Sequence, residues 1–121
     1  MQAAVAQVLS CPSAYVVDGD TLRCGSVRLR LLGIDAPELP GHCPPYRQCE
    51  PGDSFASKRS LIEALRYGRV TYSVVTTDRF GRYVVMAWAG RENLSCWQLK
   101  RAQAVYKPRW DNGGLVAAAC R

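Results

Sequence analysis

The chain has 121 residues, 48% of them hydrophobic, a net charge of +6 and a mean hydropathy of −0.14. This length fits one domain over residues 1–121 with one buried core, and the composition excludes a disordered chain. The apolar runs are too short to span a bilayer, so no membrane partner is expected.

The positive charge is concentrated in the second half of the chain. Residues 1–60 hold six Lys/Arg and six Asp/Glu, whereas residues 61–121 hold ten Lys/Arg and four Asp/Glu. A neutral half with clustered acids joined to a basic half suits a polyanionic substrate held near a metal ion. The alternative is a charged surface that serves only solubility.

Residues 14–34 predict three short strands. Residues 14–19 and 20–25 form two strands around a tight Asp-Gly turn, and residues 27–34 alternate as a third strand. The alternation places two arginines, Arg28 and Arg30, on one face of that third strand.

Residues 36–53 hold five prolines and two glycines, which predicts a loop. A helix is expected next, with Asp53 or Ser54 as its N-cap and Gly68 as its stop. Its apolar residues at helical spacing are Phe55, Leu61, Ile62 and Leu65.

Residues 69–78 and 82–90 predict two strands joined by the turn "DRFG", and Asn93 can cap a helix over 94–104. Residues 114–120 predict a last short helix. Three strands, a helix, two strands and a helix favour a mainly β, α+β fold. The expected form is an OB-fold, a five-stranded Greek-key barrel with a helix between strands 3 and 4 and one or two C-terminal helices. A five-stranded α+β sandwich is the alternative.

Six cysteines without a CxxC pair favour disulfides over a zinc site. Fifteen pairings are possible, and closure between neighbouring segments favours Cys11–Cys24, Cys43–Cys49 and Cys96–Cys120. The alternative is six reduced cysteines in a cytosolic protein. Bridges indicate a secreted or periplasmic protein, and because no signal peptide is visible we expect a mature or trimmed chain.

Acidic and basic side chains gather near the strand ends. Asp20 and Asp35 follow strands that could meet at one rim of a small barrel, and carboxylates suit a hard cation such as Ca²⁺ or Mg²⁺. Hydrolysis of a phosphodiester requires such a cation, guanidinium groups for the phosphoryl oxygens and a carboxylate for the attacking water. Arg30 and Glu38 fit these roles, and "TDRFGR" adds Arg82.

Three motifs in this order, "VVDGDT", "RLLGIDAPE" and "TDRFGR", resemble the staphylococcal nuclease (thermonuclease) family over residues 14–112. The resemblance implies an OB-fold, Ca²⁺ as cofactor, cleavage of DNA and RNA, and 3′-phosphate ends. It implies that Arg30, Glu38 and Arg82 are catalytic. It assigns the metal site to Asp20, Asp35 and the backbone carbonyl of Ala36, with Asp18 tuning the ion from nearby.

The chain departs from the family at several positions. Ala36 stands where relatives often have Thr, and Arg79 and Phe80 stand where many have Lys-Tyr. Arg79, Phe80 and, more weakly, Tyr106 are candidate substrate contacts. The Cys43–Cys49 loop is unusual, and its tip, Tyr46 and Arg47, could touch substrate.

We expect a monomeric calcium-dependent endonuclease acting on DNA or RNA. The alternative is an OB-fold module that binds nucleic acid without cleaving it.

Overall fold

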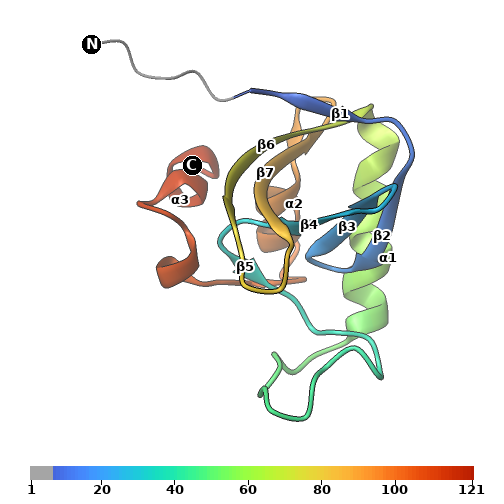
Figure 1. Cartoon of the computed structure of the whole chain (residues 1–121), viewed down its shortest axis with the longest axis vertical. Helices are drawn as coiled ribbons and strands as arrows, with labels where there is room; N and C mark the ends of the chain where they lie inside the picture. Colours follow the sequence, from blue (N-terminus) through green and yellow to red (C-terminus); the bar gives the residue numbers. More distant parts are fainter. Residues whose placement is uncertain (1–6) are drawn as a thin grey trace.

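The computed structural model describes residues 7–121, which form a strongly curled sheet with helices packed around it (Figure 1). The chain is thus a mixed α+β protein with a barrel-like sheet. The strands are β1 Leu9–Cys11, β2 Ala14–Asp18, β3 Thr21–Cys24, β4 Val27–Leu31, β5 Ile34–Asp35, β6 Val70–Thr77, β7 Tyr83–Ala89, β8 Glu92–Asn93 and β9 Val105–Tyr106. The helices are α1 Ser54–Ala64, α2 Leu94–Lys100 and α3 Leu115–Ala119, with 3₁₀ turns η1 Leu65–Tyr67 and η2 Pro108–Trp110.

The main sheet has the order β1-β6-β7-β4-β3-β2, and β8 pairs with β7. All neighbours are antiparallel except β4 and β7, which run parallel. Because β1 and β2 are consecutive in the chain yet lie at opposite ends of this order, the sheet must curl back toward itself. β5 and β9 form a separate two-stranded pair.

The predicted strands are confirmed, except that the third ends at Leu31 instead of continuing to residue 34, and β1, β5, β8 and β9 are additional. The second helix is shorter than expected, since α2 ends at Lys100 instead of continuing to residue 104. Ala102 adopts a left-handed backbone conformation (φ 55°), and the chain then turns to pair β9 with β5. Sheet pairing has overridden the helical preference of this segment, and it places the C-terminal segment beside Asp35.

Helix α1 uses a different face from the one predicted from its apolar residues. Phe55 and Ile62 are 55% and 46% exposed, and the buried positions are Ser54, Ser57, Ser60, Leu61 and Ala64. These mostly small residues allow the helix to approach the β2–β3 turn closely. A Cβ added to Gly19 would lie 1.8 Å from Ser57 Oγ, so this turn requires glycine.

The core is built from the inner faces of the sheet and from α1 and α2. Its fully buried members include Leu22, Leu29, Leu31, Val85 and Leu94. Three disulfides join the pairs expected from the sequence: Cys11–Cys24 links β1 to β3, Cys96–Cys120 links α2 to the end of α3, and Cys43–Cys49 closes the loop before α1. Such bridges are typical of proteins in oxidising compartments. Within residues 7–121 no helix has the length and apolar composition needed to cross a membrane.

Candidate active site

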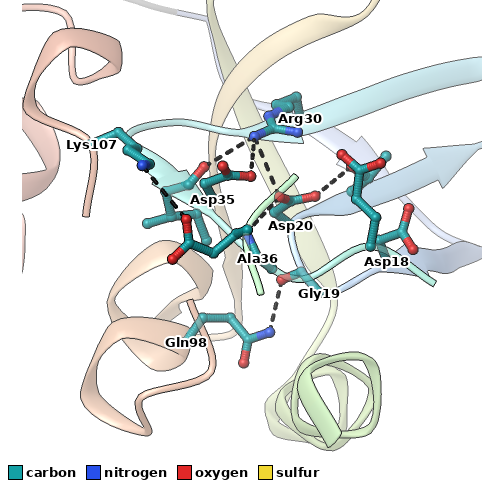
Figure 2. Close-up of polar contacts among 12 residues, drawn as sticks. Asp18, Gly19, Asp20, Arg30, Asp35, Ala36, Gln98 and Lys107 are labelled. Atoms are coloured by element: carbon teal, nitrogen blue, oxygen red, sulfur yellow. Dashed lines mark hydrogen bonds and ion pairs between the residues drawn. The ribbon is translucent and has the colours of Figure 1, made fainter. Parts of the chain in front are cut away.

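The turn between β2 and β3 holds Asp20 in a fixed position. Its Oδ2 accepts a hydrogen bond from the amide of Ala36 (2.8 Å) and its Oδ1 accepts one from Thr21 Oγ1 (2.8 Å). Behind the turn, the side chain of Gln98 on α2 donates to the carbonyl of Gly19 (2.7 Å; Figure 2). Asp20 is fully buried, and this burial raises the pKa of its carboxyl group above the ordinary value.

Arg30 on β4 joins Asp20 to Asp35. Its Nη2 lies 3.4 Å from Asp20 Oδ2 and 3.3 Å from Asp35 Oδ1, and it also donates to the carbonyl of Ile34 (3.3 Å; Figure 2). All three charged side chains are at least nine-tenths buried. We call Asp20, Arg30 and Asp35 the carboxylate floor.

Asp18 does not contact Arg30. Its side chain instead faces the loop that follows β5. It accepts hydrogen bonds from the amide of Leu39 (2.9 Å) and from Nδ1 of His42 (2.9 Å). It therefore fastens the loop to the end of β2. His42, the one histidine of the chain, takes part in this fastening.

Glu38 lies under the disulfide-closed loop. Its side chain is 8% exposed, and its Oε1 lies 2.8 Å from Nη1 of Arg47. Burial raises the pKa of Glu38, and the guanidinium of Arg47 counteracts part of that rise. Arg47 also places Nη2 3.3 Å from Asp35 Oδ1, so one loop residue contacts two of the predicted functional carboxylates.

Arg82 is held by the turn that precedes β7. Asp78 accepts hydrogen bonds from the amides of Phe80 (2.9 Å) and Arg82 (3.0 Å), and its Oδ2 lies 2.7 Å from Nε of Arg82. Because Asp78 binds Nε, the terminal nitrogens of the guanidinium are left for another anion.

Two hollows meet at this turn. The basic hollow, about 670 Å³, is lined by Arg30, Arg79, Phe80, Arg82, Arg109 and Trp110, among others. The second hollow, about 370 Å³, is lined by residues that include Asp18, Glu38 and His42. Four residues, Tyr46, Arg47, Phe80 and Arg82, line both hollows. The structure thus brings Arg30, Glu38 and Arg82 to adjoining surfaces.

The candidate substrate contacts differ in their positions. The guanidinium carbon of Arg79 lies 5.1 Å from the centre of the Phe80 ring, and both residues line the basic hollow. The hydroxyl of Tyr106 donates to the buried carboxylate of Asp111, and Tyr106 lines neither hollow. Trp110 takes the hollow-lining position, with its ring centre 5.2 Å from the guanidinium carbon of Arg30.

The carboxylate floor has the donors for a hard divalent cation. Asp20 and Asp35 supply carboxylate oxygens, and the amide of Ala36 that binds Asp20 holds Ala36 beside them. One nitrogen of Arg30 already lies within 3.4 Å of both carboxylates, so both oxygens face a common point. A cation bound by Asp20 and Asp35 would also offset the cost of keeping Asp20 charged in its buried position. These residues fit Ca²⁺.

Sequence reasoning gave the carboxylate floor its members but not all of its contacts. Arg47 was foreseen only as a possible substrate contact, and its ion pairs with Asp35 and Glu38 depend on the path of an irregular loop. In the sequence, only the predicted Cys43–Cys49 disulfide indicates that the tip of this loop is held near the site.

No protein-family model matches the chain. Among curated proteins it is similar to ExoI, a succinoglycan biosynthesis protein of Rhizobium meliloti (strain 1021), with 30% identity over 110 residues. The match covers 88% of this chain and 56% of the relative, so the chain spans about half the length of the curated relative that it matches.

Proposed function

We propose that this chain is a member of the staphylococcal nuclease family and a calcium-dependent endonuclease of DNA, RNA or both. The observation that carries the proposal is Arg30, which bridges two buried carboxylates and shares a hollow with Arg82, next to Glu38. Guanidinium groups and a cation-binding carboxylate pair are the chemistry that a phosphodiester requires.

The strand order supports the finer fold assignment, an OB-fold. Leaving aside the short β1 and β8, the strands read in sheet order as the fourth, fifth, third, second and first, with a parallel pair between the third and fifth. This is the arrangement expected for a Greek-key barrel with a helix after its third strand. The disulfides support an oxidising compartment, which is consistent with the proposed export to the periplasm or outside the cell.

In the proposed reaction, water attacks phosphorus in line and the 5′ oxygen leaves, which yields 3′-phosphate ends. Glu38 orients the water or takes its proton, and its raised pKa suits proton transfer. Arg30 and Arg82 bind the phosphoryl oxygens as negative charge develops on them. Ca²⁺, when bound by Asp20, Asp35 and the Ala36 carbonyl, supplies neutralising charge and a template for the substrate.

The name of the curated relative refers to succinoglycan biosynthesis. The basic hollow, with five arginines among its lining residues, fits an anion with several oxygens, and this favours a phosphodiester over a sugar substrate. The other candidate is a nucleic-acid-binding module without turnover, which exposed aromatics and arginines around the hollow would also serve.

The deciding experiment incubates the pure protein with plasmid DNA and with RNA, in calcium or in chelator. We expect cleavage in calcium, none in chelator, and a loss of about 10²- to 10³-fold in kcat for Arg82→Ala, as for the removal of one transition-state donor. Arg59→Ala, on the exposed face of α1, removes the same charge and should leave kcat unchanged. DNA that is retarded but intact would instead establish the binding module.

A further inference from the structure

Arg47 is the third guanidinium group at the site, and its attachment differs from that of Arg30. Arg30 extends from the central strand β4, is 6% exposed, and also donates to a backbone carbonyl. Arg47 lies on a loop, its side chain is 27% exposed, and its hydrogen-bond partners are the two carboxylates of Asp35 and Glu38. Of the two, Arg47 is the group that can change partners without disturbing the sheet.

The Cys43–Cys49 disulfide keeps Arg47 within reach of the carboxylates. The bridge joins two cysteines that are only six positions apart in the chain. Ligand atoms of Glu38, Cys43 and Cys49 lie within 4.8 Å of one another, so the bridge itself rests against the Glu38 carboxylate. The sulfurs are bonded to each other and do not serve as metal ligands. A short closed loop anchored there limits how far Arg47 can move.

Formal charges show why a divalent cation would release Arg47. The carboxylates of Asp20, Asp35 and Glu38 carry three negative charges, and Arg30 and Arg47 carry two positive charges, which leaves one negative charge. A divalent cation reverses this to one positive charge. Arg47 would then lie next to like charge, and a phosphodiester, with one negative charge, would restore neutrality.

We propose that Arg47 is a tethered counter-cation, which competes with the divalent cation for Asp35, pairs with Glu38 until the cation displaces it, and then binds a substrate phosphate. The inference rests on the proposed nuclease function. The position of Arg47 fits the binding of a substrate phosphate. Arg47 lines both hollows and so lies where a nucleic-acid strand would pass from one hollow to the other. Arg47 is then a substrate-binding residue supplied by the loop.

The first test is calcium affinity, measured by isothermal titration calorimetry on protein freed of metal with chelator. Removing the competitor in Arg47→Ala should tighten calcium binding about 10-fold, the scale seen when groups around metal ligands are altered. Arg47→Lys keeps the charge without the bidentate fork and should lie between wild type and Arg47→Ala. Arg59→Ala controls for the lost charge and should match wild type. Unchanged or weaker calcium binding in Arg47→Ala overturns the inference.

The second test is the steady-state cleavage of a short oligonucleotide in saturating calcium. Losing one charged phosphate contact should raise KM about 10-fold in Arg47→Ala, with a smaller change in kcat. The salt dependence of kcat/KM should weaken by about one phosphate contact. An unchanged KM and salt slope refutes the phosphate role.

The two tests separate this inference from the proposed function. If wild type binds calcium and cleaves DNA while Arg47→Ala behaves like wild type, only the role of Arg47 is wrong. If wild type neither binds calcium nor cleaves, the proposed function is wrong, and the role of Arg47 falls with it. Near-ultraviolet circular dichroism of each variant verifies its fold.

Discussion

The carboxylate floor and the surface around the basic hollow are held in different ways. The floor residues Asp20, Arg30 and Asp35 lie on or beside paired strands, and Arg30 faces Thr21 in the β3–β4 register. The aromatic and basic residues around the hollow come from three irregular segments: the Cys43–Cys49 loop, the turn before β7 and the segment around η2. The floor is therefore fixed by sheet register, whereas the surroundings depend on individual turn and loop contacts.

This difference indicates that the carboxylate floor and the surface around the basic hollow serve different purposes. A cation site needs ligands whose geometry does not change, and buried strand ends provide this. A surface that accepts a flexible polymer needs side chains that can move, and loops provide that. Substitutions in the floor should consequently change stability and activity together, whereas substitutions around the hollow should separate them.

The largest effect is expected for Arg30→Met. Removing Arg30 leaves Asp20 and Asp35 buried without their shared counter-charge, and breaking a buried pair on one side costs about 3–5 kcal/mol. Urea unfolding in chelator measures the free energy of unfolding. Arg23→Met removes an exposed arginine from the neighbouring strand and should change that free energy by less than about 0.5 kcal/mol. A small effect of Arg30→Met would remove the distinction between floor and surroundings.

The same distinction explains what the sequence could predict. Asp20, Arg30 and Asp35 were readable because strand alternation and turn residues fix where strand ends lie, and the motif spacing added Arg82. The buried face of α1 could not be predicted from the sequence, because the exposed Phe55 fits the helical periodicity as well as a buried residue would. Serines were not expected in the core, because their burial depends on hydrogen bonds to partners far along the chain, such as Ser57 to the carbonyl of Gln103.

The contacts of the Cys43–Cys49 loop could not be predicted from the sequence for a related reason. The ion pairs of Arg47 join residues 9 and 12 positions apart through a proline-rich segment without a repeating backbone geometry. The disulfide was predictable from local closure, but the direction in which its loop folds was not. The end of α2 was likewise set by the pairing of β9 with β5, a tertiary interaction that no local pattern encodes.

A second, smaller effect is expected for Asp111→Asn, which alters the anchor of the η2 segment. Asp111 is fully buried and accepts hydrogen bonds from Tyr106 and from the amides of Val116 and Ala117. We expect a loss of about 2 kcal/mol at neutral pH, because one of these donors then faces an amide NH₂ group. Burial acts to raise the pKa of Asp111, but the three hydrogen bonds outweigh it and hold the pKa below the ordinary value.

The pH dependence gives this prediction its sign. Because the pKa of Asp111 is lower in the folded state, its stabilisation is fully present above the ordinary value of 3.8 and is lost as pH falls through the lower, folded value. The difference between wild type and Asp111→Asn should thus shrink on acidification below about pH 4. Denaturant unfolding at a series of pH values measures it. A constant difference would mean that the charge of Asp111 is irrelevant to the anchor.

The smallest effects should separate the two aromatic residues of this segment. Trp110 is 43% exposed and lines the basic hollow, so Trp110→Leu should weaken the binding of a single-stranded oligonucleotide by about 1 kcal/mol, the low end for stacking on one base. Fluorescence anisotropy of a labelled oligonucleotide in chelator, where no cleavage is expected, measures this. Stability should change little, since the ring is not part of the core.

Tyr106→Phe is the matched comparison. It removes only the hydroxyl that donates to Asp111, so we expect a loss of about 1 kcal/mol in unfolding free energy and no change in oligonucleotide binding. The sequence indicates Tyr106 as a weak candidate substrate contact, whereas its hydroxyl donates to Asp111 and Tyr106 lines neither hollow. If Tyr106→Phe or Tyr106→Leu weakened oligonucleotide binding as much as Trp110→Leu, the substrate would extend beyond the basic hollow toward β9. Tyr106 would then belong to the binding surface and would not serve only to hold Asp111.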